Sequence, residues 1–151
     1  MPSWEFVSHS QEETVQKGRE LAARLRPPVL VLLSGELGSG KTTLTKGIIS
    51  GLGAAAEEDV TSPTFTLVHA FRNSAAAGRV YHVDLYRVTD FHDLETLGLE
   101  DVFMEQAVVI VEWAERLRLR TDWPRIEVRL EHLEEQSRRI EVIDSENLLG
   151  A

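Results

Sequence analysis

The stretch SGELGSGKTTLTKG, residues 34–47, decides the fold of this 151-residue chain. From Gly35 to Thr42 it matches the full P-loop pattern: two glycines separated by four residues, then lysine and threonine. The apolar run VLVLL, residues 29–33, precedes it and is typical of a strand covered on both faces. A helix is expected to follow over residues 40–52. Strand, glycine-rich loop and helix in this order predict an α/β domain of the P-loop class.

The composition of the loop indicates that it binds phosphate. Its glycines let the backbone curl until several N–H groups face one anion, and the following helix directs its positive end there. Lys41 adds a charge between β- and γ-phosphates, the Thr42 hydroxyl can ligate Mg²⁺, and Thr43 supports the loop or contacts the α-phosphate. The other residues expected to hold the nucleotide are Gly35, Glu36, Leu37, Gly38, Ser39 and Gly40. The alternative, a glycine-rich turn with a chance lysine, is disfavoured by the flanking elements.

Two apolar strands are expected to end in carboxylates. Residues 108–112, VVIVE, end at Glu112 in the Walker B manner, and residues 80–84, VYHVD, end at Asp84. In a parallel sheet both carboxylates emerge at the carboxyl edge, where the P-loop also lies. We therefore expect them to complete the Mg²⁺ site and to orient an attacking water. The sequence leaves open which carboxylate does which, and a solvated acid at a strand end is the alternative for each.

Other polar residues are harder to assign. The segment TSPTF, residues 61–65, can close over a γ-phosphate, although its composition by itself fits an ordinary turn. His82 lies inside an expected strand and is interpreted as packed rather than catalytic. Trp113 is either a core residue or a lid beside the nucleotide. A solvated face is the preferred interpretation of three arginines: Arg116, Arg118 and Arg120.

The rest of the chain completes a layered fold. Ser10 and Glu13 form a capping box for a helix that is expected to end near Leu25, before two prolines. The other expected strands cover residues 4–8, 65–71, 79–84, 126–132 and 139–143, and the other helices cover 90–97 and 114–120. Asn73 and Gly78 are placed in the link between the strands 65–71 and 79–84. Together these elements predict one domain over residues 1–151, a three-layer α/β/α fold whose mixed sheet has a parallel core and antiparallel additions.

Composition limits the classes of function. Hydrophobic residues make up 42% and charged residues 27% of the chain, as in ordinary globular proteins. With 16 basic and 25 acidic residues the net charge is −9, so we expect no broad nucleic-acid surface and at most an indirect contact with RNA. There is no cysteine, no apolar run long enough to span a bilayer and no N-terminal stretch typical of a signal peptide. A cytoplasmic protein without membrane contact is the expectation.

Five segments in order carry a resemblance to a known family. GELGSGKTTLTKG, SPTFTLVH, HVDLYRV, LETLGLED and VIVEWAERL together resemble the bacterial ATPase subunit family of threonylcarbamoyladenosine tRNA modification, called TsaE or YjeE. The resemblance extends over nearly the whole chain. It is specific because of the order of the five segments, since the P-loop alone fits many proteins.

The resemblance implies a weak ATPase that binds ATP and Mg²⁺ within a complex. The implied partners are the transferase subunit that carries threonylcarbamoyl to adenosine 37 of tRNA and that enzyme's catalytically silent paralogue. The ATP cycle would reset the complex. On this resemblance Thr64 is the switch threonine, Asp84 and Glu112 hold or orient Mg²⁺ and water, and Trp113 matters for activity. Ala114 stands where some relatives have proline.

Two other functions remain open at this point. A small P-loop kinase would pass the γ-phosphate to a metabolite, but it needs an acceptor pocket and an arginine-bearing lid, for which only residues 116–120 are available. A non-hydrolysing module in which nucleotide gates partner docking would use the same P-loop residues. A GTPase is disfavoured because the chain has no Asn-Lys-x-Asp segment.

Overall fold

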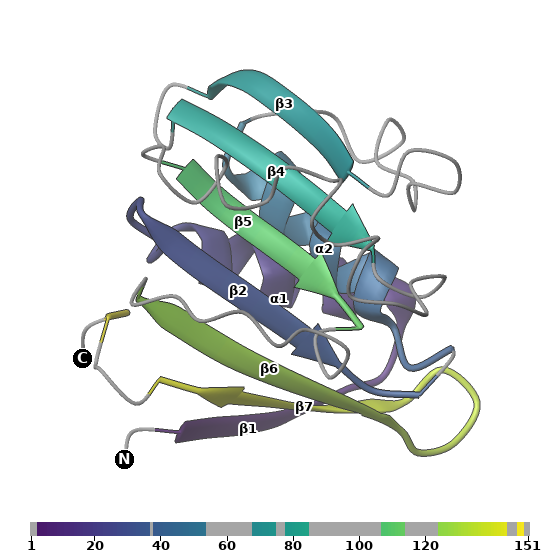
Figure 1. The fold of residues 1–151 in the computed structure, drawn as a ribbon. Coiled ribbons are helices and arrows are strands. Elements are labelled where there is room, and N and C mark those ends of the chain that lie inside the picture. Colours follow the sequence, from purple (N-terminus) through teal and green to yellow (C-terminus); the bar gives the residue numbers. More distant parts are fainter. Residues whose placement is uncertain are drawn as a thin grey trace, which may run out of the picture.

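The computed structural model describes residues 3–36, 38–53, 68–74, 78–84, 107–113, 124–144 and 148–149. These residues include a seven-stranded sheet. The strands are β1 (Ser3–Ser8), β2 (Val29–Ser34), β3 (Val68–Ser74), β4 (Gly78–Asp84), β5 (Ala107–Glu112), β6 (Arg125–His132) and β7 (Arg138–Ile143). The helices are α1 (Gln11–Ala22) and α2 (Lys41–Gly51). Figure 1 shows both helices packed side by side behind the sheet.

The order of the strands is β1-β7-β6-β2-β5-β4-β3. The four central strands, β6, β2, β5 and β4, run parallel to one another. On one side β7 pairs antiparallel with β6 and β1 pairs antiparallel with β7, and on the other side β3 pairs antiparallel with β4. The predicted α/β class with a mixed sheet is therefore confirmed.

The main core lies between the sheet and the two helices. Alternate residues of β2, β4 and β5, among them Val31, Val80 and Ile110, pack with Leu44 and Ile48 of α2. The intervening residues on the opposite face are equally buried: Leu30, Val83, Val109 and Val111 are all 0% exposed. Burial on both faces explains why these strands are continuous apolar runs.

Helix α1 begins as predicted and ends earlier. The Ser10 hydroxyl accepts a hydrogen bond from the Glu13 amide (3.0 Å), while the Glu13 carboxylate accepts one from the amide of His9 (3.1 Å). The predicted end near Leu25 is wrong, because the helix stops at Ala22. The next residues form tighter bonds to the carbonyl three positions back, and Pro27 and Pro28 cannot donate at all.

The β3–β4 hairpin also differs from the prediction. Asn73 and Gly78 were expected in the link, but the structure places Asn73 in β3 and Gly78 in β4. The pairing continues to Ser74 and Gly78 after an irregularity that follows Phe71. Backbone hydrogen bonding with the neighbouring strand therefore outweighs the weak strand preference of Asn and Gly.

The two helices approach each other through glycines. A Cβ added to Gly18 would lie 2.5 Å from the carbonyl oxygen of Leu44 and 2.9 Å from the Cα of Gly47. A Cβ on Gly47 would overlap the carbonyl of Val15. The absence of side chains at these two positions lets the backbones of α1 and α2 come into contact, which no hydrophobic pattern had indicated.

Some predicted elements lie outside the described residues, namely the start of the strand predicted at 65–71 and the helices predicted at 90–97 and 114–120. Within the part of the chain that the structure describes, no helix is long and apolar enough to cross a membrane.

Candidate phosphate-binding site

The P-loop joins the carboxyl end of β2 to the start of α2. Three of its glycines adopt positive φ angles, 148° at Gly35, 81° at Gly38 and 103° at Gly40. Residues other than glycine rarely adopt this backbone conformation. Gly40 is the N-cap of α2 and offers no side chain to the first amides of the helix. These N–H groups therefore remain directed out of the helix end, as in an anion-binding site.

Lys41 lies across the loop rather than out in solvent. Its side chain is 5% exposed, and Nζ donates to the carbonyl oxygens of Gly35 (2.6 Å) and Glu36 (2.8 Å). A longer bond of 3.3 Å reaches the hydroxyl of Ser39, which is itself buried. The ammonium group therefore lies against the P-loop. Phosphate oxygens can replace the two carbonyl oxygens as its hydrogen-bond acceptors.

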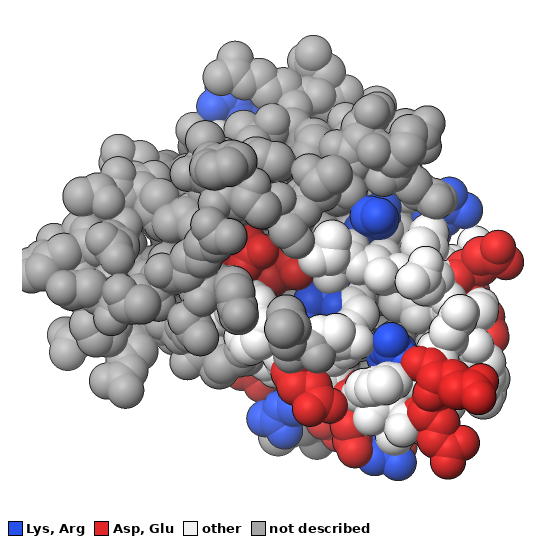
Figure 2. Space-filling view, turned by 90° about the vertical axis from the view of Figure 1, so that its right-hand side faces the viewer, with Lys and Arg blue, Asp and Glu red and all other residues white. Residues whose placement is uncertain are grey.

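The ends of β4 and β5 bring two carboxylates to the same edge. Asp84 and Glu112 are paired in register across the parallel strands, and both are buried. The Thr42 hydroxyl donates to Oε1 of Glu112 at 2.8 Å. The P-loop and the acidic end of β5 are thus in direct contact. Figure 2 shows this side of the molecule, where acidic and basic atoms lie next to each other near its centre.

His82 contacts the same carboxylate. Its side chain is 0% exposed, and Nε2 forms a short hydrogen bond with Oε2 of Glu112. The expectation that His82 is packed within the strand is correct, but its place in the site was missed. The alternation of β4 contains the signal, because residues 82 and 84 must face the same side of the sheet.

Trp113 adopts a backbone conformation that is unusual for a bulky residue, with φ of 61°. This turn directly after β5 places its ring over Lys41, with Nζ 3.9 Å from the ring centroid, a cation–π distance. The sequence left open whether Trp113 is a core residue or lies beside the P-loop. Its ring lies at the P-loop and is not part of the core cluster.

The β6–β7 hairpin supports the loop from the other side. A Cβ on Gly35 would overlap the carbonyl oxygen of Leu130 in β6 and lie 2.7 Å from the hydroxyl of Ser39. A Cβ on Gly40 would lie 3.7 Å from Cγ of Arg138 in β7. This contact between the hairpin and the P-loop had no counterpart in the sequence pattern.

Several predicted site residues remain untested. Leu37 and Thr64 lie outside the described residues, as do the segment 61–65 and the three arginines at 116–120. Thr43 is described and half-buried in the first turn of α2.

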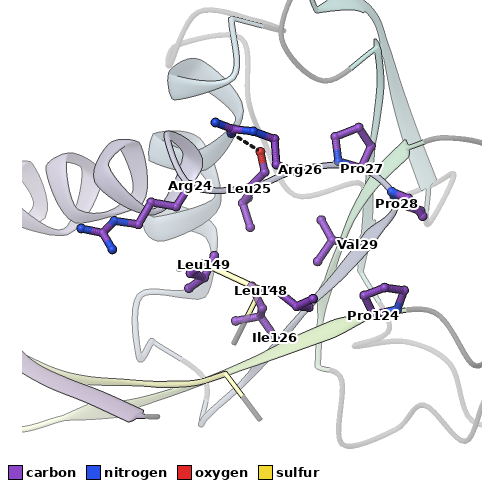
Figure 3. A pocket seen from close by; sticks show the side chains of 10 residues that line it. All are labelled: Arg24, Leu25, Arg26, Pro27, Pro28, Val29, Pro124, Ile126, Leu148 and Leu149. Carbon is purple, nitrogen blue, oxygen red and sulfur yellow. Dashed lines mark hydrogen bonds between the residues drawn. The ribbon is translucent and has the colours of Figure 1, made fainter. Parts of the chain in front are cut away.

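A cavity of about 220 Å³ lies at the opposite edge of the sheet (Figure 3). Pro28, Pro124 and other residues near the starts of β2 and β6 line it. Its two arginines already have partners, since Arg24 lies over the ring of Trp4 and Arg26 donates to the carbonyls of Ala23 and Leu25. None of the predicted site residues that the structure describes lines it.

The residues present at the P-loop fit a nucleotide with Mg²⁺. The positive-φ glycines curve the loop, and the ammonium group of Lys41 lies against it, within hydrogen-bond distance of Gly35 and Glu36. Hydroxyl and carboxylate oxygens are the ligands that Mg²⁺ prefers, and it commonly uses only one or two from the protein. The Thr42 hydroxyl and the carboxylates of Asp84 and Glu112 are donors of this kind. Among the described residues, no group of three or more His, Cys, Asp or Glu side chains is arranged so that it could hold a metal ion by itself.

A P-loop between a buried strand and a helix, facing acidic strand ends on a mixed α/β sheet, defines the P-loop NTPase class of fold. A family model described as "Threonylcarbamoyl adenosine biosynthesis protein TsaE" matches residues 8–140. The chain belongs to this family.

Individual relatives agree with the family model. The tRNA threonylcarbamoyladenosine biosynthesis protein TsaE of Haemophilus influenzae is 38% identical over 120 residues, which cover 80% of this chain and 73% of the relative. The protein of the same name from Bacillus subtilis is 36% identical over 137 residues, covering 91% and 82%. The crystal structure of Bacillus subtilis YdiB superposes with a TM-score of 0.69 at 28% identity, covering 97% of this chain and 88% of that one.

Proposed function

We propose that the chain binds ATP with Mg²⁺ and hydrolyses it slowly, as a subunit of the complex that makes N6-threonylcarbamoyladenosine in tRNA. The observation that carries this proposal is the hydrogen bond between the Thr42 hydroxyl and Glu112. It joins the phosphate-binding loop to an acidic strand end, which is how P-loop NTPases build their metal site.

The residues of the loop would share the binding of the nucleotide. Backbone N–H groups of the P-loop and the first turn of α2 would bind phosphate oxygens, and Lys41 would balance their charge. Thr42 and the carboxylates of Asp84 and Glu112 would hold Mg²⁺ directly or through its waters. When bound, Mg²⁺ neutralises charge that develops on the phosphate oxygens.

The carboxylates also suit the hydrolytic step. Water attacks the γ-phosphorus, the bond to the bridging oxygen breaks, and ADP leaves with that oxygen. A carboxylate such as Glu112 or Asp84 can orient the water and accept its proton. Trp113 and the buried surroundings limit access of further water to Lys41, which strengthens electrostatic interactions there.

The partners we propose are the threonylcarbamoyl transferase subunit and its catalytically silent paralogue. The names of the relatives support a role in this tRNA modification. A net charge of −9 favours contact with tRNA through these partners rather than directly. The ATP cycle would regulate or reset the transferase complex, and the cytoplasm is the proposed compartment.

Lys41→Ala tests the site directly. We expect calorimetry to show loss of ATP binding, since the main cation at the phosphates is removed. Lys46→Ala, which removes the same charge from the same helix away from the loop, is the matched control and should bind as wild type. Unchanged ATP affinity in Lys41→Ala would overturn the assignment of the P-loop.

Phosphate release tests the activity. Wild-type protein with ATP and Mg²⁺ should release phosphate slowly alone and faster with both transferase subunits. ATP binding without any release under either condition would replace the ATPase with a nucleotide-gated binding module. Loss of ATP that depends on an added metabolite acceptor would indicate a kinase.

A further inference from the structure

The polar imidazole ring of His82 is fully buried in the sheet. It lies on β4 between Val80 and Asp84, on the face that α2 covers, and opposite Ile110 of β5. A buried imidazole is costly unless its nitrogens find partners. Its Nε2 meets Oε2 of Glu112, whose own side chain is only 2% exposed. The two groups therefore depend on each other.

The two oxygens of Glu112 are divided between two donors. Oε1 accepts from the Thr42 hydroxyl at 2.8 Å, and Oε2 accepts from Nε2 of His82. An ionised carboxylate has only acceptors, so both contacts need a proton on the partner. Two donors at opposite oxygens prevent the carboxylate from rotating, whereas one donor would leave its plane undetermined.

The orientation of Glu112 determines what Thr42 can offer. A hydroxyl has one proton and two lone pairs. Because its proton is directed to Oε1 of Glu112, its lone pairs point away from that carboxylate, in directions from which an oxygen ligand binds a cation. If the carboxylate turned, the hydroxyl proton of Thr42 would lose its acceptor. The proton could then point in the direction from which a cation would bind the hydroxyl oxygen.

We propose that His82 is a positioning residue for Mg²⁺: by binding Oε2 it fixes Glu112 so that Oε1 orients the Thr42 hydroxyl toward the metal. This inference rests on the proposed function. Either the neutral tautomer with a proton on Nε2 or the imidazolium ion provides the donor, so the role depends on geometry and not on a change of charge. Partners of this kind around metal ligands typically contribute about 10- to 100-fold to metal affinity or activity.

Three substitutions separate positioning from packing. His82→Gln keeps an amide donor near the place of Nε2, and His82→Asn carries the same amide on a shorter chain that cannot reach Oε2. Val80→Ala removes buried volume from the same face of β4 without removing a donor. Urea denaturation of each variant measures the stability that every later comparison must take into account.

The decisive measurement is metal binding, with turnover as a second readout. Mn²⁺, followed by electron paramagnetic resonance with ADP present, should bind His82→Asn about 10- to 100-fold more weakly than wild type. His82→Gln should recover most of this loss. Val80→Ala should lose stability but keep wild-type Mn²⁺ affinity. Affinity for ADP without metal should stay the same throughout, and kcat should follow the Mn²⁺ result.

The outcomes are distinguishable. Equal Mn²⁺ affinity in His82→Asn and wild type, or equal losses in the Gln and Asn variants, would overturn the positioning role alone. An effect of Val80→Ala as large as that of His82→Asn would reduce His82 to packing. Wild-type protein that binds neither ADP nor Mn²⁺ would overturn the proposed function, and this inference with it.

Discussion

Glu112 is a carboxylate in an almost fully buried position, and its surroundings explain how it can stay there. An isolated buried charge would be strongly unfavourable. Hydrogen bonds to a charged group contribute about 1.5–3 kcal/mol each, and Glu112 accepts one from Thr42 and one from His82. The same bonds that stabilise the charge also orient it, so stability and site geometry share their residues.

Glu112→Gln is expected to separate binding from hydrolysis. The amide of glutamine keeps the size of the side chain but has no charge. Its NH2 group replaces one carboxylate oxygen and therefore faces a hydrogen-bond donor, either Thr42 or His82. ATP affinity, measured by calorimetry, should stay within a few-fold of wild type. Turnover, measured as phosphate release, should fall by about a hundredfold to ten-thousandfold, the usual range for a general base. Unchanged turnover would transfer the catalytic role to Asp84.

The glycines of the P-loop differ in how much space surrounds them. Comparing the stability of Gly35→Ala with that of Gly38→Ala tests this difference. Both residues have positive φ, but a Cβ would meet backbone only at Gly35, while Gly38 has nothing within 4 Å. Gly38→Ala should therefore cost only the backbone strain, about 1–2 kcal/mol. Gly35→Ala should lower the free energy of unfolding further. Equal losses in urea denaturation would show that the hairpin does not constrain the loop.

At the scale of elements, the contact between α1 and α2 is made by backbone. Gly18 and Gly47 face each other, and Gly51 lies against Arg19 and Ala22 of α1. Such close approach brings the loop-bearing helix α2 tightly against the rest of the molecule. It therefore helps to hold the start of α2, and with it the P-loop, in place.

Gly47→Ala should consequently destabilise the protein. Helix propensity alone predicts a gain of up to about 1 kcal/mol, because alanine favours helix over glycine. Overlap with the carbonyl of Val15 opposes this and should lead to a net loss of about 1–3 kcal/mol in urea denaturation. Gln16→Ala, at an exposed position of α1, is the control and should change stability little. A stabilised Gly47→Ala variant would contradict the close approach of the helices.

At the scale of the whole molecule, both parts of the sheet contribute to one site. The parallel strands β4 and β5 supply the carboxylates, and the antiparallel hairpin of β6 and β7 supports the P-loop at Gly35 and Gly40. The guanidinium of Arg138 donates to the carbonyls of Glu135 and Ser137, which ties the turn of this hairpin together beside the loop. The P-loop therefore has contacts on both sides, with the acidic end of β5 and with the β6–β7 hairpin.

Affinity for the proposed transferase subunits should accordingly depend on the nucleotide. Calorimetry with ATP under non-turnover conditions and with ADP should give affinities that differ by roughly 5- to 150-fold, the usual range of such coupling. Thr64→Ala should reduce this difference while sparing ADP binding, as the family resemblance implies. Equal affinities with ATP and ADP in the wild-type protein would leave a passive nucleotide site.

The sequence by itself determined the P-loop, the buried strands and the last two strands, because local patterns encode them. Glycines with positive φ, continuous apolar runs and alternating residues each have a local physical cause. The end of α1 and the extent of the β3–β4 hairpin were mispredicted, since backbone pairing and tight turns there outweigh residue preference.

Only the tertiary structure decided which of these pieces touch. Residues 42 and 112 are far apart along the chain, and parallel pairing of β2 with β5 brings them together. The bond from His82 to Glu112, the glycine contact between α1 and α2, and the support of Gly35 by Leu130 likewise depend on strand order and register. Residue preferences act over a few positions of the chain, whereas these contacts arise from packing between elements that are distant in sequence.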